Sequence, residues 1–305
     1  MIMPIGAFRP RPGWQNERQF FYKYARPTTA LAILEGKRLR WSTPATLNDP
    51  FDTRFDMPIE LDPRIKQQTL DRLWNMHYGD GIAAPGNRLG EAVRALRGIF
   101  PKLDRVEFDQ EFGESFDEAL VAMREGVPAM QRELASQMST SKILCLTEVP
   151  DNLLMWAHYA ESHTGACFEF QSVPEFDSPW GAARAVEYVE KLPLFADADT
   201  VSRVLAGEAV FDHRTIMDRF VYSKSVHWAY EREWRVFSGD GRERTAPYED
   251  IPFHVPELSS VILGINVGPD FCERVESLLR DRYPGATLRQ AHKSQSAFEL
   301  TISET

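Results

Sequence analysis

Residues 142–170 read Lys142-Ile-Leu-Cys-Leu-Thr-Glu-Val-Pro-Asp-Asn-Leu-Leu-Met-Trp-Ala-His-Tyr-Ala-Glu-Ser-His-Thr-Gly-Ala-Cys-Phe-Glu-Phe170. This stretch predicts a strand, a short helix and a second strand. Residues 143–147 are a brief run of apolar, β-prone residues, and Pro150 with Asp151 supplies a helix start. The helix is expected over residues 153–160.

The second strand begins after Gly165, which lets the chain leave the helix. Between Ala166 and Phe170, apolar residues alternate with Cys167 and Glu169. Alternation of this kind is the period of a half-buried strand.

Polar and aromatic side chains gather between these two strands: Thr147, Glu148, Trp156, His158 and Tyr159. In an otherwise apolar unit, such groups need hydrogen-bonding partners or a ligand. The sequence therefore predicts a candidate functional site in this unit.

The composition of the 305 residues is that of a globular protein able to bury a full core, with 43% hydrophobic and 26% charged residues. The formal net charge of −10 opposes non-specific attraction to nucleic acid or to an anionic membrane. The three cysteines are isolated and form no CxxC pair, which argues against a zinc site or a disulfide.

The first residues contain several prolines and arginines and no continuous apolar stretch, so no secretory signal is expected. No apolar run approaches the length of a membrane span. We therefore expect a cytoplasmic protein with no membrane partner.

Upstream of the central unit, residues 20–41 predict a strand, a helix and another strand. Residues 48–52, Asn-Asp-Pro-Phe-Asp, predict a turn whose Asx side chains bond the nearby backbone. Residues 62–140 carry apolar residues at helical spacing and predict a mainly helical insertion.

Downstream, we expect strands at 184–189, 224–237 and 261–263 and near Leu288 and 298–300, and helices at 200–219 and 270–282. No internal repeat and no flexible linker is visible. Residues 1–305 are therefore expected to form a single α+β domain, in which a mixed, mostly antiparallel sheet has flanking helices and the helical insertion at 62–140.

The predicted strand at 224–237 carries two carboxylates two residues apart. On a strand, Glu231, Glu233 and Arg235 share one face, while Trp234 and Val236 share the other. If the apolar face packs on the core, both carboxylates emerge together. A solvent-facing strand with cross-strand ion pairs gives the same pattern, so this alternative stays open.

Five strings occur together in a fixed order: Asn48-Asp49-Pro50-Phe51-Asp52, Leu154-Met155-Trp156-Ala157-His158-Tyr159-Ala160, Gly165-Ala166-Cys167-Phe168-Glu169-Phe170, Tyr230-Glu231-Arg232-Glu233-Trp234-Arg235 and Val261-Ile262-Leu263-Gly264. Their combination closely resembles a bacterial family, the domain of unknown function twenty-nine seventy-one. The resemblance runs from about Phe21 to Leu300 and implies a bacterial intracellular protein.

A looser resemblance is to the ADP-ribosyltransferase fold. Members begin with a strand, a helix ending in glycine and another strand, as residues 22–41 do. They continue with a strand that leads through Ser or Thr into a helix bearing an aromatic residue, as residues 144–159 do. They finish with a strand carrying Glu-x-Glu, as residues 231–233 do. This resemblance implies an enzyme that uses NAD as a substrate, either for ADP-ribose transfer or for NAD glycohydrolysis, and that works as a bacterial toxin or defence effector.

Cleavage of the bond between nicotinamide and ribose builds positive charge on the sugar, which a fixed carboxylate stabilises. Glu233 is our candidate for that carboxylate, and Glu231 is the candidate that orients or deprotonates an acceptor. Tyr159 or Trp156 would stack on nicotinamide. The residues assigned to NAD binding are Lys23, Tyr24, Arg26, Arg38, Arg40, Thr147 and Trp156.

His158 is included among the catalytic candidates, although a histidine on a Leu/Met/Trp-rich helix is more often a hydrogen-bonded core residue. No His-x3-His or His-x-His spacing links it to His163 or His227, so no metal is expected. We expect His158, Tyr159 and Glu233 to converge on one concave site.

Two other functions fit the same strings. The first is a metal-dependent nuclease or phosphodiesterase that holds Mg²⁺ with Asp49, Asp52, Glu148 and Glu231. The second is a non-catalytic module that senses a nucleotide or contacts a partner protein through its aromatic residues. The expected partners are therefore a nucleotide and a protein or nucleic-acid acceptor, and the sequence does not indicate an oligomeric state.

Overall fold

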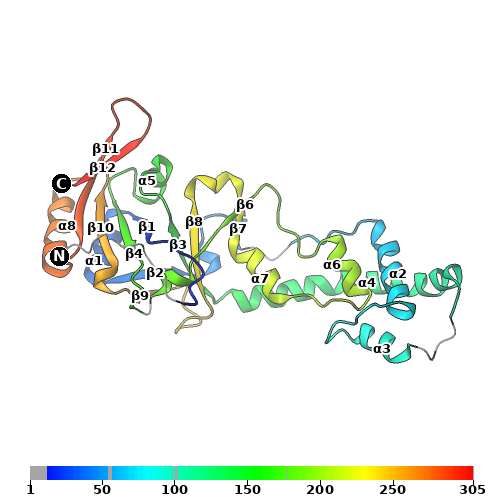
Figure 1. Ribbon diagram of the computed structural model, residues 1–305. Helices are drawn as coiled ribbons and strands as arrows, with labels where there is room; N and C mark the ends of the chain where they lie inside the picture. The colour runs from blue at the N-terminus through cyan, green and yellow to red at the C-terminus, as the bar shows by residue number, and fades with distance from the viewer. Residues whose placement is uncertain (1–11, 54–56, 98, 100–101, 177, 305) are drawn as a thin grey trace. The chain divides into compact units, whose positions relative to one another are not determined.

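A computed structural model describes residues 12–53, 57–97, 99, 102–176 and 178–304 (Figure 1). The chain divides into two compact units. The first comprises Met1–Asp52, Met138–Tyr188 and Val221–Thr305, and the second comprises Thr53–Gln137 and Val189–Phe220.

The first unit is built mainly of strands, with helices between them. Its elements in chain order are β1 (Phe20–Ala25), α1 (Pro27–Gly36), β2 (Arg38–Ser42), η1 (Pro44–Thr46), β3 (Lys142–Thr147), α5 (Leu153–Tyr159), β4 (Ala166–Gln171), η2 (Pro179–Ala182), β5 (Arg184–Ala185), β6 (Glu187–Val189), β7 (Ser223–Ser225), η3 (Val226–Glu231), β8 (Glu233–Ser238), β9 (Tyr248–Pro252), η4 (Val255–Glu257), β10 (Leu258–Leu263), α8 (Pro269–Arg282), β11 (Thr287–Lys293) and β12 (Leu300–Glu304).

The second unit is helical. It contains α2 (Arg64–Tyr78), α3 (Arg88–Leu96), α4 (Arg105–Met138), α6 (Ala198–Leu205) and α7 (His213–Tyr222), of which α4 and α7 end in the first unit. The helices expected within 62–140 are present. The second unit also takes in residues 189–220, which the sequence did not assign to it.

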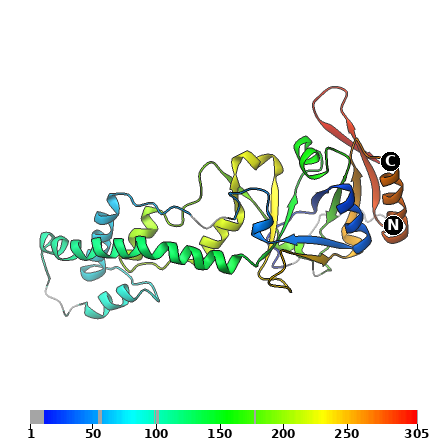
Figure 2. The same cartoon turned by 180° about the vertical axis from the view of Figure 1, so that it is seen from behind.

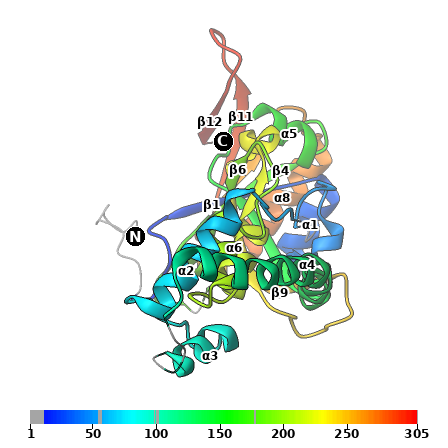
Figure 3. The same ribbon diagram turned by 90° about the vertical axis from the view of Figure 1, so that its right-hand side faces the viewer.

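The main sheet of the described residues runs in the order β12-β11-β10-β4-β1-β3-β2-β9, with β8 paired to β3 and β5. Only β10 and β11 are parallel neighbours within it. The hairpin of β11 and β12 extends past the neighbouring strands (Figure 3). The expected α+β class, with a mixed and mostly antiparallel sheet, is confirmed.

Helices cover both faces of this sheet around β4. On one face, α1 and α8 pack on Phe168, Phe170 and Val261 (Figure 2). On the other face, α5 packs through Trp156 on Cys167. The half-buried strand expected at 166–170 is therefore wrong, because β4 lies between β1 and β10 and is buried on both faces.

The sheet opens between β1 and β3. Among the described residues, β1 and β3 are paired at Tyr22 and Thr147, and β2 and β3 at Ser42 and Ile143. By contrast, β3 pairs with β8 along its whole length. The ammonium of Lys23 spans part of the opening and donates to the carbonyl oxygen of Cys145 at 2.7 Å. The separated strands leave room for a pocket.

The strand expected over residues 224–237 is not continuous. It is divided into β7, the 3₁₀ helix η3 and β8. Arg232 breaks it, because its φ of 45° and ψ of 51° place it in the left-handed region. Only the part from Glu233 onward alternates as predicted.

Candidate functional site

A pocket of about 180 Å³ lies where β1, β2 and β3 separate. It brings together residues from β1 and β2, the turn after η1, β3, α5 and the segment 224–233. Seven of the side chains assigned to the site from the sequence line it: Lys23, Tyr24, Arg40, Thr147, Tyr159, Glu231 and Glu233.

Glu231 and Glu233 reach the pocket by a route that the sequence did not predict. They do not alternate along one strand, because Glu231 ends η3 and Glu233 starts β8. The left-handed backbone of Arg232 turns the chain between them. The hydroxyl of Thr147 donates to the main-chain carbonyl of Glu231 at 2.6 Å and holds the turn against β3.

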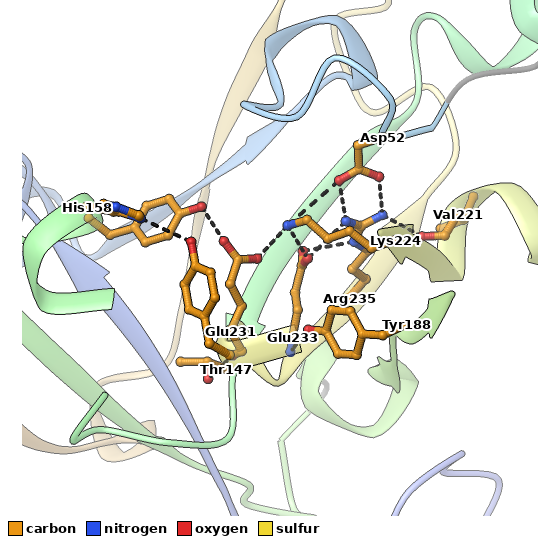
Figure 4. Close-up of polar contacts among 11 residues, drawn as sticks. Asp52, Thr147, His158, Tyr188, Val221, Lys224, Glu231, Glu233 and Arg235 are labelled. Atoms are coloured by element: carbon orange, nitrogen blue, oxygen red, sulfur yellow. Dashed lines mark hydrogen bonds and ion pairs between the residues drawn. The ribbon is translucent and has the colours of Figure 1, made fainter. Parts of the chain in front are cut away.

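Both carboxylates belong to a buried cluster of charges (Figure 4). The ammonium of Lys224 contacts Glu231 and also donates to Glu233 Oε2 at 2.9 Å. The guanidinium of Arg235 donates to Glu233 Oε1 at 2.8 Å and binds both oxygens of Asp52 at 2.8 and 2.5 Å. The cluster therefore holds three carboxylates against two cations.

The two glutamates differ in protonation. Burial raises the pKa of Glu233, but the charges of Arg235 and Lys224 outweigh burial and lower its pKa to about 2. Burial also raises the pKa of Glu231, and there the attraction of Lys224 does not offset it, so its pKa is above the ordinary value. Glu233 is thus held ionised, whereas Glu231 accepts a proton more readily.

Tyr159 is the aromatic residue of α5 that faces this cluster. Its hydroxyl donates to Glu231 Oε1 at 2.5 Å. Burial and the neighbouring Glu231 charge raise the pKa of Tyr159, so the phenol stays protonated and remains a donor. The expected convergence on one concave site is thus found for Tyr159 and Glu233, both of which line the pocket.

His158 does not line the pocket. It is exposed, and its Nδ1 lies 3.1 Å from the hydroxyl of Tyr230. Because helix α5 turns by about 100° per residue, Tyr159 and His158 leave it in different directions. The stripe that α5 buries comprises Met155, Trp156 and Ala160.

Two further cations, Lys23 and Arg40, line the pocket without belonging to this cluster. Lys23 donates to Cys145, and Arg40 is bound to Asp250 at 3.0 and 3.2 Å and stacks on Tyr248. Within the described residues, no carboxylate forms an ion pair with Lys23.

Three of the residues assigned to NAD binding lie elsewhere. Arg26 is the residue before α1 and is exposed, and Arg38 is exposed on β2, with a 3.4 Å contact to the carbonyl of Asp250. Trp156 is fully buried, and its Nε1 donates to the carbonyl of Pro150 at 2.9 Å. Its ring therefore offers no free face to a ligand, and the predicted stacking of Trp156 on nicotinamide is wrong.

The carboxylates of the proposed Mg²⁺ site are not gathered. Glu148 pairs with Arg18 at 2.6 Å and with Arg232, while Asp52 is taken by Arg235. No group of three or more His, Cys, Asp or Glu side chains suited to a metal is found in the part of the chain that the structure describes. Nor does any helix in that part have the length and apolarity needed to cross a membrane.

Sequence reasoning did not assign Lys224, Arg235 and Tyr188 to the site, and it named Asp52 only as a ligand of the alternative Mg²⁺ site. Arg235 carried a signal, because its position two residues after Glu233 puts it on the same strand face. Lys224 carried none, since η3 separates it from the glutamates and no spacing rule links them. The main-chain N–H of Glu233 donates to the hydroxyl of Tyr188 at 2.7 Å, a contact between distant segments.

Comparison with known proteins finds a family that part of the chain resembles. Residues 155–236, from α5 to β8, match the model of a family described as "Protein of unknown function (DUF2971)". Over these residues the chain is similar to this family, and the resemblance drawn from its motifs is confirmed there. No curated protein and no solved structure matches the chain significantly.

Proposed function

We propose that the protein is an ADP-ribosyltransferase-like enzyme that acts on NAD, either transferring ADP-ribose or hydrolysing NAD. The observation that carries the proposal is the environment of Glu231. This carboxylate is bound by Tyr159 and Lys224, faces a pocket and is 3% exposed.

The charge of the cluster suits the reaction. Asp52, Glu231 and Glu233 together outnumber Lys224 and Arg235 by one negative charge. Cleavage of the bond between ribose C1′ and the nicotinamide nitrogen leaves the electron pair on nicotinamide and positive charge on the sugar. A preorganised negative cluster stabilises that charge more in the transition state than in the ground state.

Glu231 is the better candidate for direct action, which revises the assignment drawn from the sequence. Glu233 is bound by two cations, Arg235 and Lys224, whereas Glu231 is bound by one cation, Lys224, and by the neutral hydroxyl of Tyr159. The raised pKa of Glu231 is closer to that of a useful base. In the proposed reaction it accepts the proton of the water or acceptor group that attacks C1′, while Glu233 holds Lys224 in place.

The dimensions of the pocket agree with binding of part of a nucleotide. A volume of about 180 Å³ is below the roughly 300–1,000 Å³ typical of sites for drug-sized ligands. The pocket would therefore take one ring, with Tyr22, Tyr24 and Tyr159 around it, and the rest of NAD would extend outside. Lys23 and Arg40 supply cations for the pyrophosphate.

A test is to incubate the pure protein with NAD and to follow nicotinamide release by chromatography. We expect release by the wild type and a loss of about a hundredfold or more in Glu231→Gln, because a general base contributes on that order. Glu148→Gln is the matched control, since Glu148 is also a carboxylate paired with cations, here Arg18 and Arg232, but does not line the pocket. The proposal is contradicted if nicotinamide is released neither with any protein or nucleic-acid acceptor nor in cells.

A non-catalytic nucleotide-binding module is the second candidate, and the ion pairs of Lys224 favour it. In the structure, Lys224 already neutralises part of the charge of both glutamates. Thermal stabilisation by NAD or another nucleotide without turnover would identify this function. With either function, we place the protein in the bacterial cytoplasm, where NAD is available, as a toxin or defence effector.

A further inference from the structure

The chain passes between its two compact units at four places, and at three of them it contacts the same two residues, Glu233 and Arg235. Asp52 and Tyr188 are the last residues before the chain leaves the first unit, and Val221 is the first after it returns. Asp52 and the carbonyl of Val221 bind Arg235, and the hydroxyl of Tyr188 accepts the main-chain N–H of Glu233. We call these the three anchored crossings (Figure 4).

All hydrogen-bond donors of the Arg235 side chain are engaged in these contacts. A guanidinium has five N–H donors. In Arg235 they reach Glu233 Oε1 and Oε2, Asp52 Oδ1 and Oδ2 and the carbonyl oxygen of Val221, at 2.5 to 2.9 Å. The side chain is 0% exposed, so water cannot replace a lost partner. A change at Asp52 or at Val221 must therefore alter the bonds that Arg235 makes to its other partners.

The same pair is linked to the pocket. Glu233 Oε2 accepts from Lys224, and Lys224 in turn contacts Glu231. A series of hydrogen bonds therefore runs from the three crossings through Arg235, Glu233 and Lys224 to the carboxylate of Glu231, which lines the pocket. It consists of contiguous buried hydrogen bonds between charged groups, which are the stronger kind.

We infer that Glu233 and Arg235 are positioning residues that couple the pocket to the three anchored crossings, the segments of the first unit that lead into and out of the helical unit. An occupant of the pocket then changes the order of the crossing segments, and a change in those segments changes the placement of Glu231. Such coupling is reciprocal by thermodynamic necessity. The inference needs only the pocket and not the reaction proposed for it.

The fourth crossing provides an internal control. The chain returns to the first unit at Met138, whose hydrogen bonds are with Ser141 rather than with Glu233 or Arg235. If coupling runs through Glu233 and Arg235, substitution of either residue leaves amide exchange near Met138 unchanged.

The first test measures amide hydrogen exchange in the full chain. Glu233→Gln should speed exchange in residues 49–53, 186–190 and 219–224 by about tenfold or more, because bonds to a charged partner are lost. Exchange at 136–140 should stay as in the wild type, and Glu148→Gln should leave all four segments unchanged. Equal acceleration in all four segments, or in none, would overturn the inference.

A second variant removes one contact without touching a charge. Tyr188→Phe deletes the hydroxyl that accepts the Glu233 N–H. We expect faster exchange in 186–190 and also in 49–53. Exchange in 219–224 is not used in this test, because β6, which contains Tyr188, pairs directly with β7. A response confined to 186–190 would overturn the coupling, even if Glu233→Gln does not fold.

The reverse direction is read at Glu231 itself. Tyr188→Phe should move the titration midpoint of the Glu231 carboxyl, followed by carbon NMR, whereas Glu148→Gln should not. An unchanged midpoint would show that the crossings do not act on the pocket. Because none of these measurements uses NAD, they stand whether or not nicotinamide release is found.

Discussion

Glu231 and Glu233 are the same residue type two positions apart, yet their surroundings give them opposite properties. Glu233 has cations on both carboxylate oxygens, and its pKa is lowered to about 2. Glu231 shares Lys224 with it and has the hydroxyl of Tyr159 as its other partner, and burial raises its pKa. Arg235 accounts for the difference, because it binds Glu233 and not Glu231.

The first prediction concerns the charge of Glu233. Its folded pKa of about 2 is below the ordinary 4.5. The ionised carboxylate therefore stabilises the fold fully at pH values above 4.5. That contribution is lost as pH falls from about 4.5 towards 2. Glu233→Gln should therefore lower the free energy of unfolding by about 3 kcal/mol at pH 7, and the difference from wild type should shrink as pH falls through that window.

Denaturant unfolding at several pH values between 7 and 3 measures this difference. Glu231→Gln is the comparison variant. Because burial raises the pKa of Glu231, its ionised form opposes folding, and removing the charge should not destabilise the protein as Glu233→Gln does. Equal losses in the two variants, or a loss for Glu233→Gln that does not change with pH, would contradict the assignment.

At the scale of elements, the short turn from η3 to β8 places both glutamates. Arg232 holds φ at 45°, a region that costs a non-glycine residue roughly 1–2 kcal/mol. Its side chain is exposed and pairs with Glu148. The turn therefore depends on a backbone conformation that β-branched residues avoid and that asparagine tolerates.

The second prediction compares two substitutions at this turn. Arg232→Val and Arg232→Asn both remove the pair with Glu148, so their difference isolates the backbone. Arg232→Val should be less stable than Arg232→Asn by about 1 kcal/mol or more, as measured by thermal unfolding. It should also move the Glu231 titration midpoint, because the turn aims that carboxylate. Equal stability and equal midpoints would show that the left-handed turn does not matter.

The elements of the first unit were largely predictable because their patterns are local. The strand, helix and strand within residues 20–41 and the central unit at 142–170 were found near their predicted places, since apolar spacing and Gly and Pro positions mark them. The break at Arg232 was not predictable, because nothing in the string Tyr230-Glu231-Arg232-Glu233 marks a left-handed residue.

The candidate site was predictable only in part, because some of its residues are brought together by tertiary contacts and not by local sequence patterns. Tyr159, Glu231 and Glu233 stand in recognisable strings, whereas Lys224 and Tyr188 join them through tertiary contacts. Trp156 lies in the core rather than in the pocket, because its ring packs on Cys167 and its indole N–H is bound by the carbonyl of Pro150. The opening between β1 and β3 depends on strand pairing, which no local pattern specifies.

At the scale of the whole molecule, the second unit is made of two separate pieces of chain, residues 53–137 and 189–220. The second piece completes the core of the first, since Ala206 is buried with Leu73, Met76 and Phe108. Close packing between the pieces is enforced at Gly90, where a Cβ would lie 2.3 Å from the carbonyl oxygen of Gly207. Neither piece buries its apolar surface alone.

The third prediction follows from this division. Arg72 pairs with Asp199 and Glu208, and the side-chain amide of Asn87 donates to the carbonyls of Val204 and Ala209 at 2.9 and 2.7 Å. All four partners lie in the second piece, so a fragment of residues 53–137 loses them together.

We expect that fragment to be helical by circular dichroism but to melt over a broad range without a cooperative transition. Joining it to residues 189–220 through a flexible glycine and serine linker should restore a sharp transition, because the core is then complete. Asn87→Ala in the joined fragment should lower its melting temperature by several degrees, since the carbonyls of Val204 and Ala209 and the helix N-cap all lose a partner. A sharp transition in residues 53–137 alone would show instead that the first piece is a complete folding unit and that residues 189–220 only lie against it.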